Sequence, residues 1–183
     1  KQPALTCFVR PSHVGASGKM AAFGNILLNV AKVCQTLEGS FSAVSTLRLA
    51  MEFNIATLME SIADVIPDNE AVVSGDVRLT YKQLDERANR FAHVLQQKGI
   101  GAGDHVGLYL FNGNEFLEAM LGTLKVRAVP ININYRYVED ELLYLFNDAD
   151  LKSLVFQREY AGRVAAIADK VPTLKQYVYV DDE

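Results

Sequence analysis

Hydrophobic residues recur along most of the chain at spacings that change between the periods of helices and strands. Three- and four-residue spacing predicts an amphipathic helix over residues 55–66, which Pro67 would end. Two short apolar runs, 71–73 and 77–79, enclose Ser74-Gly75-Asp76 and predict two strands joined in a β-hairpin. A small antiparallel unit therefore precedes the longer part of the pattern.

The next stretch carries the clearest helix signals of the sequence. Thr80 and Gln83 have the spacing of a capping box, in which each side chain bonds the backbone N–H of the other residue. Lys98 suits the C-terminal end of the helix dipole, and Gly99 suits the left-handed conformation that ends a helix. The apolar stripe consists of Leu84, Ala88, Phe91, Ala92 and Leu95. We expect its large members, Leu84, Phe91 and Leu95, to dock this helix on a sheet.

After Gly99, short apolar runs of strand length alternate with amphipathic stretches of helix length. The expected strands cover residues 105–110, 128–131, 154–156 and 177–180, and the expected helices cover residues 116–124, residues 139–146 and a stretch through Ala165 and Ile167 that ends near Pro172. Strands joined by crossover helices are parallel, so the fold class is α/β, a layered sandwich with a mostly parallel sheet. Because the chain ends on acidic residues directly after a strand, we expect more protein to follow Glu183.

Charge divides the chain near Met51. Residues 1–50 carry five basic side chains against one acidic side chain, a net charge of +4, so the remaining 13 basic and 21 acidic side chains give −8. We therefore treat residues 1–50 as a leader, and residues 51–183 as one incomplete domain. The leader could be a targeting segment, a helix that packs on the domain, or an unstructured or artefactual extension. We favour the last interpretation, because regular patterns begin only after Met51.

Composition narrows the class of protein. Half of the residues are hydrophobic and 22% are charged, which is typical of a globular domain. The formal net charge of −4 argues against a nucleic-acid partner. Cys7 and Cys34 have no metal-type spacing and do not indicate a disulfide framework, which fits a reduced cytoplasm. No apolar run approaches the length needed to span a bilayer.

Several patterns resemble a catalytic or cofactor site, but the elements around them or the spacing of their residues do not fit such a site. The cluster from Gly99 to Gly103 follows a helix and precedes a strand, whereas a dinucleotide fingerprint needs the opposite order. This disfavours a nicotinamide-binding domain. The chain has no Gly-x-Ser-x-Gly elbow and no Gly-x-x-x-x-Gly-Lys phosphate loop. The histidines, His13, His93 and His105, lack a ligand spacing, so we predict no metal site and no catalytic residue.

A polar loop after the expected strand at 128–131 is the strongest candidate for a binding site. Ligands of open α/β sheets bind beyond the carboxyl ends of the strands. The candidate substrate-binding residues there are Asn132, Asn134, Tyr135 and Arg136. The alternative is that the two asparagines satisfy backbone groups in an irregular connection. Two later arginines, Arg158 and Arg163, are expected to face water instead.

Four blocks in order make residues 51–183 resemble the adenylate-forming superfamily of acyl-CoA synthetases, luciferases and peptide-synthetase adenylation domains. The blocks are Leu79–Leu84 with Ala88-Asn89-Arg90, Gly103–Gly107 with Asn112 and Glu115-Phe116, Leu124–Arg136, and Glu141–Asp150 with Leu154-Val155. Within the superfamily, Pro130–Arg136 is similar to bacterial fatty-acyl and steroid-type CoA ligases, whereas amino-acid adenylation domains tend to have Pro-Leu-Asp-Pro here. The leader takes no part in the resemblance.

The resemblance implies the N-terminal part of an AMP-binding acyl-CoA synthetase. Such an ATP-dependent acid–thiol ligase joins a carboxylic acid to ATP as an acyl-adenylate, and the CoA thiol then displaces AMP. The substrates and cofactors implied are a fatty or steroid-type acid, ATP, Mg²⁺ and CoA, and lipid substrates would allow a peripheral association with membranes. The family's phosphate loop, aspartate and lysine match nothing in this chain, so we expect the chain alone to be inactive. The alternative is a non-catalytic α/β binding or interaction module.

Overall fold

The computed structural model describes residues 5–8 and 54–181. Five parallel strands form one sheet in the order β1-β7-β6-β4-β5, and a separate pair, β2 and β3, forms an antiparallel hairpin. The strands are β1 Leu5–Phe8, β2 Glu70–Ser74, β3 Val77–Thr80, β4 His105–Tyr109, β5 Val129–Asn132, β6 Leu151–Gln157 and β7 Gln176–Val180. The helices are α2 Ile55–Val65, α3 Tyr81–Gln97, α4 Asn114–Lys125, α5 Glu139–Asp148 and α6 Ala161–Ile167, with short 3₁₀ turns η2 Arg158–Tyr160 and η3 Ala168–Lys170. The predicted α/β fold with a parallel sheet is confirmed.

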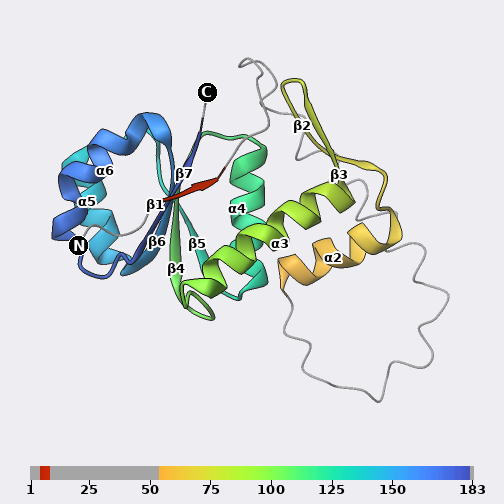
Figure 1. Cartoon of the computed structure of the whole chain (residues 1–183), viewed down its shortest axis with the longest axis horizontal. Coiled ribbons are helices and arrows are strands. Elements are labelled where there is room, and N and C mark those ends of the chain that lie inside the picture. The colour runs from red at the N-terminus through yellow and green to blue at the C-terminus, as the bar shows by residue number, and fades with distance from the viewer. Residues whose placement is uncertain (1–4, 9–53, 182–183) are drawn as a thin grey trace.

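The helices cover both faces of the sheet (Figure 1). On one face, α3 and α4 pack on Val106, Leu108 and Val155. On the other face, α5 and α6 pack on Tyr109, Leu154 and other buried strand residues. Successive strand residues therefore point into opposite cores, which explains the nearly continuous apolar strands in the sequence. Among the described helices, none combines the length and the apolar character that crossing a membrane requires.

Helix α3 links the sheet to the hairpin. The predicted capping box is present: Thr80 Oγ1 accepts from Gln83 N–H at 3.2 Å, and Gln83 Oε1 accepts from Thr80 N–H at 2.9 Å. Phe91 and Leu95 pack toward the sheet as predicted. Leu84, expected on the sheet, instead packs with α2 and the hairpin, because α3 continues past the sheet and needs a second apolar partner there.

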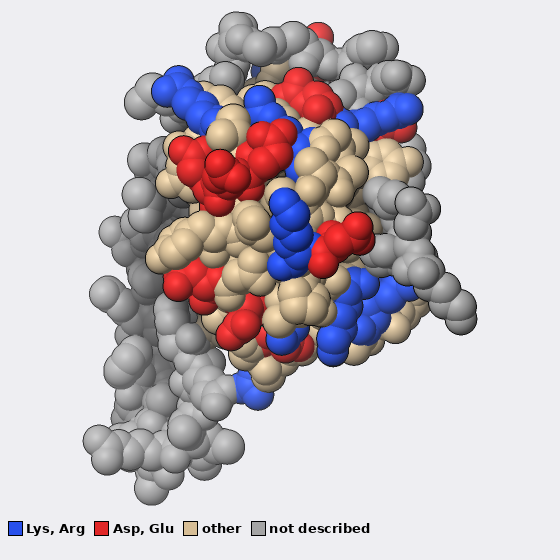
Figure 2. Space-filling view, turned by 90° about the vertical axis from the view of Figure 1, so that its left-hand side faces the viewer, with Lys and Arg blue, Asp and Glu red and all other residues tan. Residues whose placement is uncertain are grey.

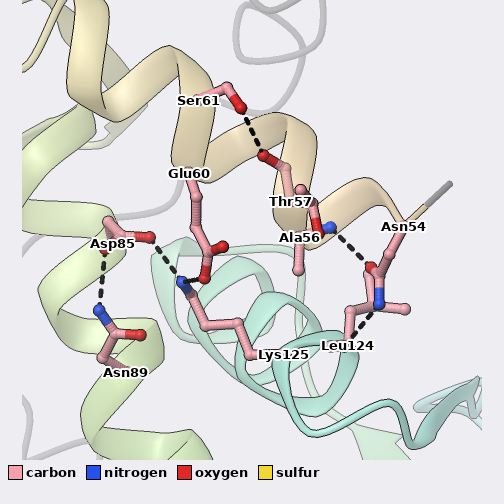
Figure 3. Close-up of polar contacts among 9 residues, drawn as sticks. All are labelled: Asn54, Ala56, Thr57, Glu60, Ser61, Asp85, Asn89, Leu124 and Lys125. Atoms are coloured by element: carbon pink, nitrogen blue, oxygen red, sulfur yellow. Dashed lines mark hydrogen bonds and ion pairs between the residues drawn. The ribbon is translucent and has the colours of Figure 1, made fainter. Parts of the chain in front are cut away.

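Polar contacts fix α2 across α3 and α4 (Figure 3). Asn54 caps α2 by accepting from Ala56 N–H at 2.8 Å, and its amide donates to the Leu124 carbonyl at 3.0 Å. The Lys125 ammonium on α4 contacts Glu60 on α2 and lies 2.7 Å from Asp85 on α3. One nearly buried cation thus joins three helices.

Strand β1 comes from the segment that the charge pattern set apart as a leader. Leu5–Phe8 pairs in parallel with Tyr177–Val180 and forms one edge of the sheet. The sequence pattern did not predict this strand. The other positions of the expected leader, 1–4 and 9–50, lie outside the described residues, so the division of the chain at Met51 stays a prediction.

Candidate functional site

Aromatic side chains gather beyond the carboxyl ends of neighbouring strands. Phe111 follows β4, Tyr135 follows β5 and Tyr160 follows β6. The ring centroids of Phe111 lie 5.1 Å from Tyr135 and 5.7 Å from Tyr160, and Tyr160 lies 4.4 Å from the fully buried Tyr109. These tilted contacts have the geometry that aromatic pairs prefer. We call Tyr109, Phe111, Tyr135 and Tyr160 the aromatic cluster.

Two arginines lie over rings of the aromatic cluster and face one cleft. The Arg136 guanidinium is 5.6 Å from the Tyr135 ring centroid, and that of Arg163 is 5.4 Å from the Tyr160 ring centroid. Both distances suit cation–π attraction. The cleft has a volume of about 520 Å³ and also includes Phe111 and Glu159. Planar rings with two guanidinium groups provide surfaces for a flat apolar group and donors for phosphate or carboxylate oxygens.

A second cleft also has Tyr135 in its lining. It has a volume of about 370 Å³, and its lining includes the amide side chains of Asn112, Asn132 and Asn134. Leu110, Ile133, Tyr137 and Leu145 complete the lining with Tyr135. We call the first the arginine cleft and the second the amide cleft. Tyr135 belongs to both, so the two form adjoining parts of one candidate site.

The four residues predicted to bind substrate all lie at this site. Asn132 and Asn134 line the amide cleft, Arg136 lines the arginine cleft, and Tyr135 lines both. Asn134 also has the local role that the alternative interpretation gave it, because its Oδ1 accepts from Arg136 N–H at 3.0 Å. The structure therefore brings the predicted residues together, and their contact with a substrate stays a prediction.

Arg163 and Tyr160 were not predicted as site residues. Arg163 is partly exposed, in line with the expectation that it faces water, but its guanidinium also donates to Tyr109 Oη and to the Tyr137 carbonyl oxygen, each at 3.1 Å. The hydrogen bond to Tyr109 raises the pKa of Arg163, so the group stays charged. Burial raises the pKa of the Tyr160 phenol, which therefore stays neutral at physiological pH. Sequence spacing gave no signal for either residue, because their partners follow other strands.

A second polar cluster lies in the contact between α3 and α4. Glu118 is fully buried, and its Oε1 accepts from Arg87 Nη1 and from Asn114 Nδ2, each at 3.0 Å. Burial raises the pKa of the Glu118 carboxyl, although both donors oppose this. Neither cleft is lined by Glu118, so we treat this cluster as part of the helix packing.

The rejected motifs keep the structural roles that their context indicated. Gly99 and Gly103, with φ of 72° and 80°, lie between the end of α3 and the start of β4. His93 is exposed on α3, and His105 Nδ1 contacts the Ala149 carbonyl oxygen, which joins β4 to the end of α5. Within residues 5–8 and 54–181, no three His, Cys, Asp or Glu side chains gather as a metal-binding group.

The outer face of α5 and α6 has no large area of one charge. In Figure 2, which looks at this side of the molecule, acidic and basic side chains are interspersed with uncharged surface. A nucleic-acid surface would need a positive stripe or patch. This face therefore gives no support to nucleic-acid binding.

Comparison with known sequences identifies relatives over the same part of the chain. The family model described as AMP-binding enzyme matches residues 59–183. A medium/long-chain-fatty-acid–CoA/3-oxocholest-4-en-26-oate–CoA ligase of Mycobacterium marinum is 48% identical over 134 residues, which cover 73% of this chain and 24% of the relative. A 3-oxocholest-4-en-26-oate–CoA ligase of Rhodococcus rhodochrous is 45% identical over 132 residues, which cover 72% and 24%. The chain thus spans about a quarter of the length of these relatives.

Solved structures of related sequence share the fold. The N-terminal domain of FACL13 from Mycobacterium tuberculosis, solved with an inhibitor, matches with a TM-score of 0.66 and 34% identity, over 69% of this chain and 33% of that chain. A fatty acyl CoA synthetase of the same organism matches with the same TM-score and identity, over 69% of this chain and 26% of that chain.

Proposed function

We propose that this chain, which belongs to the AMP-binding enzyme family, is part of a ligase that converts a fatty or steroid-type carboxylic acid to its CoA thioester. The observation that carries the proposal is the 48% identity to a fatty-acid and 3-oxocholest-4-en-26-oate CoA ligase over 134 residues. The names of the relatives cover both fatty and steroid acids, so the proposal includes both classes.

The proposed reaction has two balanced steps. A carboxylate oxygen of the acid attacks the α-phosphorus of ATP, and pyrophosphate leaves, which gives the acyl-adenylate. The CoA thiol then attacks the acyl carbon and loses its proton, and AMP leaves. The first step turns a carboxylate oxygen, which is a poor leaving group, into part of AMP, which is a good one. Mg²⁺ would bind to the phosphates of ATP, and no three His, Cys, Asp or Glu side chains of the described residues gather to hold it.

We further propose that Asn132, Asn134, Tyr135 and Arg136 contact one of the substrates. Support comes from their place beyond the strand ends, where ligands of open α/β sheets bind. Arg136 is exposed and lines the arginine cleft, which suits binding of the phosphates of ATP or CoA or of the carboxylate of the acid. We also propose a cytoplasmic location, where ATP and CoA are available, with lipid substrates bringing the protein to membrane surfaces.

The test of the reaction uses the protein in which this chain occurs in its cell of origin, isolated with an antibody against the chain. It would be assayed for CoA thioester formation with ATP, Mg²⁺ and either palmitate or 3-oxocholest-4-en-26-oate. The proposal expects thioester and AMP in equal amounts with at least one acid. Absence of both products with both acids would contradict it.

The test of the binding residues uses Arg136→Ala, with Arg78→Ala as the matched control. Arg78 lies on the hairpin and pairs with Glu70 in an exposed contact at 2.7 Å, away from both clefts. If Arg136 binds a phosphate or carboxylate, its removal should weaken ATP, CoA or acid binding about tenfold or more, the effect of losing a hydrogen bond to a charged group. Equal affinities of the two variants for ATP, CoA and the acid would show that Arg136 binds none of them.

A further inference from the structure

We propose that Arg163 and Tyr109 are positioning residues that hold the loop 133–138, and with it Tyr135 and Arg136, in the conformation that forms the two clefts. The proposal concerns the loop itself, and it rests on the proposed function only in assigning a ligand to the clefts. Neither residue belongs to the sequence pattern that identified the candidate site.

The contacts join three separate elements at one carbonyl group. Tyr109 Oη, at the end of β4, donates to the Tyr137 carbonyl oxygen at 2.8 Å and lies 3.3 Å from that of Tyr135. Arg163, on α6, donates to the same Tyr137 oxygen and to Tyr109 Oη, each at 3.1 Å. The arginine therefore bonds the loop both directly and through the tyrosine. These hydrogen bonds connect the loop after β5 to β4 and to α6.

Apolar burial holds the start of this loop, where Ile133 is only 1% exposed, but holds the residues after it only in part. Tyr135, Tyr137 and Val138 are 39%, 37% and 45% exposed, so their side chains lose only part of their contact with water. Bonds within the loop close it on itself: Asn134 Oδ1 accepts from Arg136 N–H, and the Asn134 carbonyl accepts from Tyr137 N–H. At the start of the loop, Ile133 N–H donates to the Leu108 carbonyl. Beyond Ile133, the hydrogen bonds to Tyr109 and Arg163 tie the loop backbone to the sheet and to α6.

Both anchoring side chains are themselves fixed. The Tyr109 ring is fully buried, so its hydroxyl cannot exchange these partners for water without cost. The Arg163 guanidinium lies 5.4 Å from the Tyr160 ring centroid, which orients its planar donors. A hydrogen bond from a charged donor to a carbonyl is stronger than a neutral one. The loop is thus held by one buried hydroxyl and one partly exposed guanidinium, and such anchoring suits a segment that presents ligand-binding side chains.

The test compares Arg163→Met, which keeps the aliphatic stem and loses the donors, with Tyr109→Phe, which loses only the hydroxyl. Arg158→Met is the control, because Arg158 lies in the neighbouring 3₁₀ turn and forms an exposed ion pair with Asp181 at 2.8 Å. Hydrogen exchange of the intact 183-residue chain is followed for the amides of Arg136, Tyr137 and Val138 and for those of β4 and β6.

The expected result is exchange of the loop amides about tenfold or more faster in Arg163→Met, with β4 and β6 unchanged, because loss of a charged donor shifts the opening equilibrium by that factor. Tyr109→Phe should have a smaller effect of the same kind, and the double variant should fall short of the two effects combined. Unchanged exchange rates of the loop amides would overturn the proposal. An equal increase in the exchange rates of the loop, β4 and β6 would overturn it too, because it would indicate a general loss of stability.

Ligand titrations separate this proposal from the proposed function. If the chain binds ATP or CoA through the arginine cleft, Arg163→Met should weaken that binding severalfold and Arg158→Met should not. Unchanged affinity in Arg163→Met would overturn the positioning role. If the wild-type chain binds neither probe, the ligand assignment of the clefts fails, and the exchange measurement alone decides whether Arg163 holds the loop.

Discussion

Gly122 allows α3 and α4 to pack closely. A Cβ atom at this position would lie 2.7 Å from the Ala88 carbonyl oxygen and 2.8 Å from the Phe91 ring. Gly122→Ala should therefore destabilise the protein by about 1–3 kcal/mol, the usual effect of overpacking, although alanine favours helices. Gly162→Ala is the control, because a Cβ there meets nothing within 4 Å, and this variant should be neutral or more stable. Urea unfolding followed by circular dichroism measures both, and equal stabilities would contradict the packing argument.

The buried Glu118 carboxyl should make stability depend on pH. Its pKa is raised in the folded state, mainly by burial, so between the ordinary carboxyl pKa and the raised value the folded protein binds more protons than the unfolded chain. Stability should then fall as pH rises through this window above about 4.5. Glu118→Gln cannot titrate and should lack this component. Unfolding free energies of both proteins from pH 4.5 upward would reveal the difference, and parallel pH profiles would count against it.

The sequence could predict where Tyr135 and Arg136 lie, because they follow a strand and the ends of parallel strands meet at one edge of a sheet. Their role in binding stays a prediction. Arg163 was missed because its hydrogen-bond partner Tyr109 lies 54 positions earlier, and no local pattern connects them. The burial of Glu118 had no local signal either, because its ion-pair partner Arg87 lies 31 positions earlier, on α3.

Among the elements, one lysine adds ionic contacts to the apolar packing and the Asn54 hydrogen bond that attach α2. Lys125 is only 6% exposed, and it joins Glu60 on α2 to Asp85 on α3. Lys125→Met should destabilise the protein by about 1–2 kcal/mol, less than a fully buried pair, because both carboxylates are partly exposed and screened by solvent. Amides of α2 should then exchange faster than those of the sheet. Arg78→Met, which breaks a well-exposed pair, should be nearly neutral, and equal effects of the two substitutions would refute a special role for Lys125.

The order of elements from Ile55 onward could be predicted because each carries its own period and its own end signals. Strand β1 could not, because four residues without alternation give no period, and the strand depends on the exposed edge of β7. At the opposite edge, Pro130 has a further role. The N–H groups of Val129 and Ile133 face β4, so Pro130 takes an outward-facing position of β5 and removes a donor that another strand could use.

For the whole molecule, we predict that the 183-residue chain alone does not form acyl-adenylate. Adenylate formation needs donors that hold the β- and γ-phosphates of ATP, and no segment of this sequence matches the phosphate loop that supplies them in the family. Loss of such positioning lowers rates on the order of 10³-fold. The matched residues also cover only 24% of the relative from Mycobacterium marinum, and the name of ligase applies to that whole protein.

The measurement is pyrophosphate release by the purified chain with ATP, Mg²⁺ and palmitate or 3-oxocholest-4-en-26-oate. The rate should equal that of a sample without chain, while the protein isolated from the cell serves as the positive control. Arg136→Ala and Arg163→Met would be assayed beside the wild-type chain. Release above background that both substitutions abolish would refute the prediction, because it would place the reacting groups in the arginine cleft itself. Release that both leave unchanged after repeated purification would refute it too, and would place those groups outside the arginine cleft.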